Sequence, residues 1–543
     1  MARSPRRIYQ PTLSKKLDDT PVSKRESTGR LAFLVAAGIL LSRIIGLVRL
    51  RVFSHYFGLR SDSADAFNAA FRIPNFLQNL FGEGVLSASF IPVYARLLAE
   101  GEDEEAGKVA GAVGATLALA VAVLCLAGVL ATPWLIDIIA PGFSGSKRDL
   151  TISLVRILFP GAGLLVFSAW CLGILNSHRK LFLSYAAPVM WSAAMIATLV
   201  IFGGRGSLSQ LAITLAWGSV VGSALQFGIQ LPVVLRLAKN MRIQLDLSSE
   251  HVRTVIRNFA PVFVSRGVVQ ISAYIDALLA SLLPTGAVTG LINAQLIYVL
   301  PVSLFGMSVS AAELPVMSSA TGSAQEIQEA LRGRLDSGLR YIAFFIVPSA
   351  AAFLAFGDLI AGALLVTGRF TQADAQYVWG ILAGSSVGLL ASTMGRLYSS
   401  AYYALRDTRT PLKFAVLRVA LTTVLGYICA KPLPLWLGID PRWGVAGLTA
   451  SAGIAGWVEF ALLRRGMHRK LGAGVSISGF VAKLWLAAAL AVAVGSAGRL
   501  LPFATHPIYG AIATLGPFGV VYLLIGSTIA PEGRRLMMRL LRH

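Results

Sequence analysis

Charged residues are scarce in this chain of 543 residues. Asp, Glu, Lys and Arg together make up 14% of it, whereas soluble domains carry about 25%. Hydrophobic residues reach 55%, and the mean hydropathy is +0.69. Such a composition excludes an ordinary soluble domain and indicates a membrane protein.

Cysteine is rare, and motifs for metal or nucleotide binding are missing. Cys125, Cys171 and Cys429 fall inside apolar runs without a CxxC motif, which is typical of small core residues. None of the six histidines has the spacing of a metal cluster, and no Walker A sequence occurs. We therefore expect no enzyme, no ATPase and no cofactor, while coupling to a monovalent ion stays open.

Acidic residues number 26 against 48 Lys and Arg, which gives a net charge of +22. In a soluble protein this excess would suggest nucleic acid. Here the charges lie between apolar runs, so we expect no nucleic-acid partner. A long basic leader without the short apolar region of a signal peptide predicts a disordered tail followed by an uncleaved first span.

Long apolar runs recur from Gly29 to the C-terminus. Each can cross about 30 Å of hydrocarbon as a helix, and continuous rather than alternating apolar character favours helices over a barrel. We predict an all-α polytopic fold with about fourteen transmembrane helices. The expected spans are 31–57, 65–95, 108–140, 150–176, 181–203, 209–235, 256–284, 287–319, 338–367, 373–405, 411–431, 443–463, 477–499 and 508–529.

Basic residues are distributed unevenly between the loops. The first tail alone holds eight Lys or Arg, as many as all the odd-numbered loops together. By the positive-inside rule this predicts a multi-pass protein of the bacterial cytoplasmic membrane with both termini in the cytoplasm.

An internal repeat divides the chain. Residues 80–93 resemble 304–316, and 173–182 resemble 404–413, at offsets of roughly 224 to 230 residues. Six spans separate the copies, so both halves point the same way, as in transporters with a substrate site between parallel repeats. The predicted units are a disordered cytoplasmic tail (1–30), a six-helix N-lobe (31–240), a pseudo-symmetric six-helix C-lobe (250–466), two C-terminal helices (477–529) and a basic cytoplasmic tail (530–543).

A polar stripe runs along the second expected span. Its members are spaced by three or four residues and share one helix face; they are Asp65, Asn68, Arg72, Asn75, Asn79 and Glu83. Charges inside a bilayer usually face a cavity, although a helix–helix interface sealed by hydrogen bonds is the alternative. Three full charges favour a water-filled cavity. Pro74 and the step 82–84 should bend or unwind this helix.

Further charged residues fall inside other spans. Arg43 stands near the bilayer middle, whereas snorkelling to headgroups is the alternative for Arg49 and Arg51. The second half contributes Arg266, Asp276, Glu313 and Arg396. Arg266 could neutralise one of these carboxylates, and Asp65, Glu83, Asp276 and Glu313 are the candidates for proton or ion coupling. Arginine binds phosphate in bidentate fashion, so the cavity predicts an anionic substrate.

Residues 42–93 carry a recognisable pattern. The segments 42–49, 57–58, 65–75, 81–84 and 90–92 resemble the lipid II flippase family (MurJ, formerly MviN) of the multidrug/oligosaccharidyl-lipid/polysaccharide exporter superfamily. Residues 140–143, 270–272 and 403–411 are also similar to that family.

The resemblance implies two six-helix lobes around a cationic cavity and two extra helices that form a groove for a lipid tail. It also implies alternating access, by which undecaprenyl-pyrophosphate-linked peptidoglycan precursor crosses to the outer leaflet for cell-wall biosynthesis. Membrane lipids are implied partners, and cell-wall synthesis or division proteins are further candidates. Arg43, Arg49 and Asp65 match charged positions that the family uses.

Three positions depart from the family pattern. The position after Arg49, which is often acidic in the family, is Leu50 in this chain. Two positions that are often arginine in the family are Gln78 and Leu296 here. We hypothesise that Arg51 and Arg266 replace the missing charges. The alternatives are an exporter of another polyprenyl-linked oligosaccharide or amphipathic substrate, a membrane enzyme acting on lipid-linked sugars, and a scaffold for cell-wall proteins.

Overall fold

The computed structural model describes residues 22–530 except 82–84, 87–88, 239, 247, 320–322, 473–476 and 503–505, with the backbone alone for 22–37, 39, 260–273 and 324. Regular structure in this part of the chain is helical, apart from one bridge between Thr367 and Phe370. The first helix begins at Val22, so the expected disordered tail 1–30 is helical over its last nine residues. Glu83 and most of both predicted tails lie outside the described residues.

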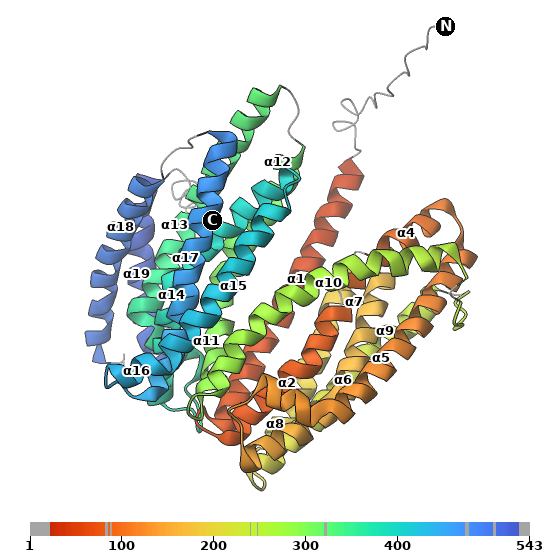
Figure 1. Ribbon diagram of the computed structural model, residues 1–543, viewed down its shortest axis with the longest axis horizontal. Coiled ribbons are helices and arrows are strands. Elements are labelled where there is room, and N and C mark those ends of the chain that lie inside the picture. Colours follow the sequence, from red (N-terminus) through yellow and green to blue (C-terminus); the bar gives the residue numbers. More distant parts are fainter. Residues whose placement is uncertain are drawn as a thin grey trace.

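The N-lobe is a bundle of helices from the first half of the chain, drawn from red to yellow in Figure 1. The expected second span is described as α2 as far as Phe81 and as α4 from Ile91. The helices are α1 (Val22–Phe57), α2 (Asp62–Phe81), α4 (Ile91–Glu100), α5 (Asp103–Ile139), α6 (Gly145–Ser177), α7 (Leu181–Ala186), α8 (Pro188–Phe202) and α9 (Leu208–Leu237).

The second half of the chain forms the C-lobe and a flanking helix pair. The expected span 287–319 contains a π-helical turn at Val302–Met307, a wide turn of the kind often found at functional sites. The helices are α10 (Glu250–Ser281), α11 (Ala287–Pro301), α12 (Ser308–Ser318), α13 (Ala324–Leu365), α14 (Gln372–Ala404), α15 (Arg409–Ala430), α16 (Pro432–Trp436), α17 (Gly444–Leu471), α18 (Ser478–Ser496) and α19 (Pro507–Ile529).

Eleven helical segments of the described chain are long and apolar enough to cross a membrane. The other three expected spans correspond to α1, α2 and α10, which are not among the eleven. An all-helical polytopic fold is therefore confirmed, whereas the count of fourteen stays a prediction.

The two lobes have separate apolar cores. One cluster of buried side chains is built from the N-lobe helices with Val252 and Val255 of α10, and the other from the C-lobe together with α18 and α19. Four N-lobe residues belong to the C-lobe cluster instead: Leu59, Ala69, Ala140 and Phe143. Most of these four lie in or beside loops at one end of the molecule, so the lobes share apolar contacts at that end and along the first turns of α10.

Backbone geometry supports the internal repeat. Arg179 and Arg406 are the only described non-glycine residues with a positive φ, and both have φ of 59°. They lie 227 residues apart, within the predicted offset. The amide of Lys180 donates to Leu175 O after α6, and the amide of Asp407 donates to Tyr402 O after α14. Corresponding helices in the two halves therefore end in the same left-handed turn.

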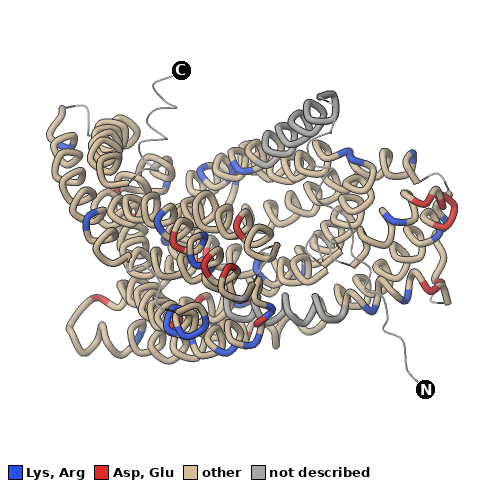
Figure 2. The backbone as a smooth tube through the Cα atoms, turned by 90° about the horizontal axis from the view of Figure 1, so that it is seen from above, with Lys and Arg blue, Asp and Glu red and all other residues tan. Residues whose placement is uncertain are grey.

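The lobes approach each other at one end and separate at the other (Figure 1). We name the first the converging end, which contains the loops 58–61, 140–144, 282–286 and 366–371. The opposite, diverging end holds the N-terminal end of α1 and is seen from above in Figure 2, where Lys and Arg occur over both lobes. Helix α10 crosses between the lobes: it packs on α4 and α5 as well as on α11, α15 and α17.

Candidate functional site

Helices α2 and α11 meet between the lobes and carry the polar stripe. They are counterparts in the internal repeat, and they contact each other in parallel, from residues 65–72 of α2 to residues 286–295 of α11. Exposure changes along the stripe: Asp65 is buried, Arg72 and Asn75 are partly buried, and Asn79 is exposed. The stripe thus begins in a sealed interface and ends on an open surface.

Asp65 is completely enclosed, with 1% of its surface exposed. Its Oδ2 accepts from Lys147 Nζ at 2.9 Å and from the amide of Gly286 at 2.8 Å. Its Oδ1 accepts from the Thr289 amide at 2.9 Å and from Thr289 Oγ1 at 2.7 Å. Gly286 precedes α11 and has no capping side chain, so the carboxylate of the N-lobe caps this C-lobe helix and stabilises its N-terminal dipole.

This geometry corrects the expectation that Asp65 faces a water-filled cavity. The sealed-interface alternative describes Asp65 in this conformation, because only 1% of its surface is exposed. Lys147 was not among the predicted site residues; it is one of the few basic residues of the odd-numbered loops. The low number of basic residues in these loops was the signal available in the sequence. A lysine that becomes buried there needs acidic partners, because burying an unpaired charge is costly.

Lys147 is the centre of a wider network at the converging end. Its Nζ lies 3.3 Å from Asp62 Oδ1 and 4.3 Å from the centre of the Phe143 ring. Thr285 Oγ1, from the C-lobe, donates to Asp62 Oδ1 at 2.8 Å. One ammonium is therefore shared by two carboxylates of α2 at the point where the C-lobe begins α11.

Arg51 binds the other lobe at the same end. Its Nη1 donates to Ala363 O at 2.7 Å and to Leu364 O at 3.0 Å, at the C-terminus of α13. A cation at a helix C-terminus is stabilised by unpaired carbonyls and by the helix dipole. In this conformation Arg51 is held by α13 instead of lining a cavity, and its predicted replacement of a missing charge stays a prediction.

Further contacts of the loops close the converging end. Arg60 pairs with Asp374 at 3.3 Å, His55 Nδ1 lies 2.8 Å from Thr367 Oγ1, and the Arg369 amide donates to His55 O at 2.9 Å. Gly58 has φ of 67°, and a Cβ there would lie 3.0 Å from Arg369 O. Only glycine allows this turn and this close approach together.

Arg72 and Asn68 extend the contact toward the middle of the molecule. Asn68 Nδ2 donates to Thr289 Oγ1 at 3.1 Å, and Arg72 Nη2 donates to Gln295 Oε1 at 3.2 Å. The hydroxyl of Tyr274 donates to the carbonyl of Arg72. Gln295 stands beside Leu296, the position where we noted a missing arginine, so Arg72 faces a neutral amide there rather than a second cation.

Arg49 and Arg43 lie on α1 beyond the sealed region. The Arg49 guanidinium is 4.2 Å from the centre of the Trp191 ring, and its Nη1 is 3.5 Å from Met195 Sδ. Arg43 is exposed. Neither arginine has a carboxylate partner among the described residues, and neither does Asn75. These groups are therefore available to an anion. While no anion is bound, the face of the Trp191 ring holds the Arg49 guanidinium in place.

The acidic candidates of the C-lobe have unsatisfied oxygens. Asp276 Oδ1 and Glu313 Oε2 are buried and have no hydrogen-bond partner among the described residues. Arg72 and Arg418 act electrostatically on Asp276, while Arg418 itself pairs with Glu459 at 3.1 Å. Arg396 is exposed on α14. The side chain of Arg266 and all of Glu83 lie outside the described residues, so their predicted roles stay predictions.

The arrangement combines a polar seal at one end with two arginines of α1, toward the other end, that have no carboxylate partner among the described residues. Such an asymmetric opening between two related lobes is what alternating access requires. The fold and the site together define a multi-pass membrane transporter with two pseudo-symmetric lobes.

Comparison with known proteins narrows this class. The family profile described as Lipid II flippase MurJ matches residues 53–515. The lipid II flippase MurJ of Burkholderia cenocepacia is 30% identical over 81% of this chain and 84% of its own length. The probable lipid II flippase MurJ of Bdellovibrio bacteriovorus is 28% identical over 92% and 95%, respectively. The chain belongs to the lipid II flippase MurJ family.

Solved structures agree on the fold. A lipid II flippase MurJ in an inward closed conformation has a TM-score of 0.74 at 23% identity, covering 93% of this chain and all of that one. An inward-facing multidrug transporter of the MATE family has a TM-score of 0.61 at 18% identity, covering 79% of this chain and 96% of its own.

Proposed function

We propose that this protein is a lipid II flippase, which moves the undecaprenyl-pyrophosphate-linked peptidoglycan precursor from the cytoplasmic to the outer leaflet of the bacterial inner membrane. Family membership carries the proposal, together with the two arginines of α1 that have no acidic partner in the described part of the chain. The activity is transport, and no bond of the substrate needs to be broken.

The charges of the site suit a pyrophosphate. Arg49 and Arg43 lie six residues apart on α1, close to 9 Å along the axis at about 1.5 Å per residue. Arginine binds phosphate oxygens in pairs and keeps its charge at any relevant pH. A cation exporter would need the opposite sign of charge at these positions.

The direction of transport follows from the asymmetry of the two ends. In the proposed orientation the diverging end faces the cytoplasm with both termini, and the converging end faces outside. The substrate would enter from the cytoplasmic side while the contacts of Asp65, Arg51 and Arg60 hold the outer side closed. Release would require those contacts to break and the cytoplasmic side to close.

We assign coupling to the buried acids of the C-lobe. Asp276 and Glu313 each have one buried oxygen without a described partner, and burying a carboxylate without compensation is costly. A proton or a monovalent cation would remove that cost. Binding of either at one stage of the cycle would link transport to an ion gradient.

The proposal is tested by depleting the protein in its host and measuring lipid II that an externally added lipid II-cleaving enzyme can reach. Accessible lipid II should disappear on depletion and return with wild type. It should not return with Arg43→Ala or Arg49→Ala. Arg236→Ala, which removes an exposed arginine from the end of α9, is the matched control and should restore it fully.

Two outcomes separate the alternatives. Unchanged accessible lipid II on depletion would overturn the flippase assignment and redirect the search to other polyprenyl-linked glycans. Loss on depletion combined with full rescue by both arginine variants would keep the function and reject these arginines as its site.

A further inference from the structure

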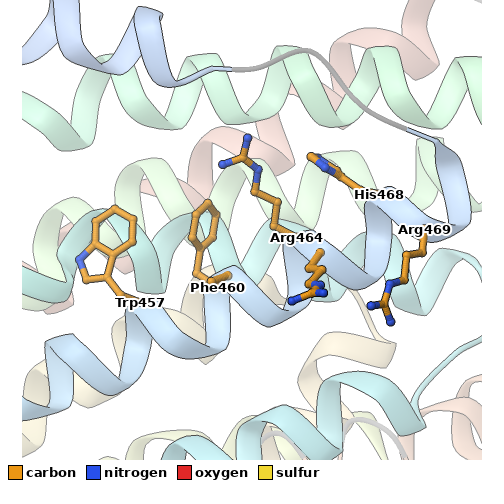
Figure 3. Close-up of a pocket in the computed structure, with 7 residues that line it drawn as sticks. Trp457, Phe460, Arg464, His468 and Arg469 are labelled. Carbon is orange, nitrogen blue, oxygen red and sulfur yellow. The ribbon is translucent and has the colours of Figure 1, made fainter.

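A basic groove lies on α17, away from the interface between the lobes. Its volume is about 620 Å³, within the roughly 300–1,000 Å³ of ligand pockets. Figure 3 shows its side chains projecting from successive turns of one helix. The lining residues are Trp457, Phe460, Ala461, Arg464, Arg465, His468 and Arg469.

The arginines of this groove have no acidic partners within the described chain. A neighbouring basic residue does, because Lys470 pairs with Asp407 at 2.5 Å. Asp336, which lines the adjoining pocket, is paired with Arg340 at 3.0 Å. Three guanidinium groups within two turns of helix thus remain without a compensating charge among the described residues.

An aromatic floor lies below the arginines. Trp457 Nε1 donates to Val387 O at 2.7 Å, and its ring packs edge-on against Phe460 at 5.6 Å. Trp457 precedes Arg464 by two helical turns, which is close to 10 Å along the axis at about 1.5 Å per residue. Cations at a helix end above a tryptophan are the arrangement found where a helix leaves the hydrocarbon and enters the headgroup layer.

The groove does not belong to the substrate site. Helix α17 makes its main contacts with α14 and α15, and lesser ones with α10 and α13, all outside the N-lobe. Trp457, Ala461, Arg465 and Arg469 are exposed on the surface that these contacts leave free. The groove therefore opens toward the surroundings of the C-lobe rather than toward α1 and α2.

We propose that this groove binds the phosphate headgroup of an anionic phospholipid in the leaflet at the diverging end. The arginines would hold phosphate oxygens, and Trp457 and Phe460 would contact the glycerol and the upper acyl chain. Basic pockets at transmembrane helix ends take anionic headgroups in this manner. The inference rests on insertion in a membrane and not on lipid II as substrate.

The apolar part of the groove favours a phospholipid over a free phosphate ion. A free anion would use only the arginines, whereas the groove continues past Ala461 to two aromatic rings. Burial of acyl methylenes against these rings adds about 0.8 kcal/mol for each buried CH₂, the equivalent of roughly fourfold in affinity.

Native mass spectrometry of the full-length protein tests the site. Protein from nanodiscs of phosphatidylcholine with one-fifth phosphatidylglycerol should retain phosphatidylglycerol in preference to phosphatidylcholine. The triple variant R464Q/R465Q/R469Q should lose that preference by about 100-fold, at roughly fivefold per arginine. Millimolar inorganic phosphate should not displace the lipid; displacement would reject the requirement for the acyl part.

Two further variants keep the result interpretable. R236Q/R257Q/R334Q removes the same charge from exposed arginines outside the groove and should retain the lipid as wild type does. R464K/R465K/R469K keeps the charge but not the bidentate geometry, and it should retain an intermediate amount. Equal lipid retention by the groove variant and the control variant, both monodisperse, would overturn the proposal.

Discussion

Asp65 provides the sharpest test of the polar seal. Its carboxylate accepts four hydrogen bonds, three of them from the C-lobe residues Gly286 and Thr289 and one from Lys147. Those three exist only while the lobes touch at the converging end. Removing the carboxylate should therefore shift the equilibrium between closed and open lobes more than it shifts folding.

The magnitude follows from burial. Lys147 and Asp65 have 12% and 1% of their side chains exposed, and breaking a buried pair costs about 3–5 kcal/mol when one charge is left alone. Lys147 keeps Asp62 as a partner at 3.3 Å, so Asp65→Ala should cost the closed state about 2 kcal/mol. That energy corresponds to a change of about 30-fold in the ratio of closed to open states.

Hydrogen–deuterium exchange of the reconstituted protein measures this shift directly. The amides of Gly286 and Thr289 donate to Asp65, so peptides covering 284–292 should exchange about 30-fold faster in Asp65→Ala. Asp149→Asn, which changes an exposed acid of α6 at the same end, should leave them unchanged. Unaltered exchange in Asp65→Ala would refute the reasoning that this carboxylate holds the lobes together.

Three other perturbations follow from the structure. Arg49→Lys should lower flipping about tenfold in the lipid II accessibility assay, because lysine keeps the charge but loses the bidentate fork and the packing on Trp191. Gly58→Ala should destabilise the closed converging end by about 1–2 kcal/mol, seen as faster exchange of peptides covering 366–371. Asp407→Asn should lower thermal stability at pH 7 by about 1 kcal/mol, because Lys470 and the Thr410 amide hold the pKa of this carboxyl below its usual range. Since that folded-state pKa is depressed, the stabilisation is complete above the unfolded-state pKa near 4, and the difference from wild type should shrink as pH falls below it.

Each of these three predictions would be contradicted by a particular result. Wild-type flipping by Arg49→Lys would show that the charge alone suffices. Exchange in Gly58→Ala equal to wild type would mean that the loop adapts without opening the end. A stability deficit of Asp407→Asn that is as large at pH 3 as at pH 7 would assign it to lost packing instead of lost charge.

Helical architecture was predictable because the hydrocarbon thickness imposes a length on every span. The stripe on α2 was predictable for a related reason, since its spacing fixes a single helix face. The contact of α2 with α11 agrees with the repeat, since these are equivalent helices of the two lobes, although we did not predict it.

Side-chain partners across the lobes could not be predicted. Asp65 and Thr289 are 224 residues apart, and Arg51 lies more than 300 residues from the carbonyls that it binds. Their pairing depends on how far the lobes have closed, which periodicity does not encode. For the same reason Arg51 looked like a cavity residue, although the unpaired carbonyls of a helix end are a better site for it in this state.

The composition of the seal explains how the lobes can separate without unfolding. Each lobe keeps its own apolar core, and the contacts across the converging end are mainly hydrogen bonds and ion pairs, with Leu59 and Phe143 as minor apolar additions. Polar contacts can be exchanged for water at small net cost, whereas exposing an apolar core could not be compensated. Breaking the capping bonds of α11 therefore leaves both lobes intact, and rigid-body rocking is the motion that these energetics favour.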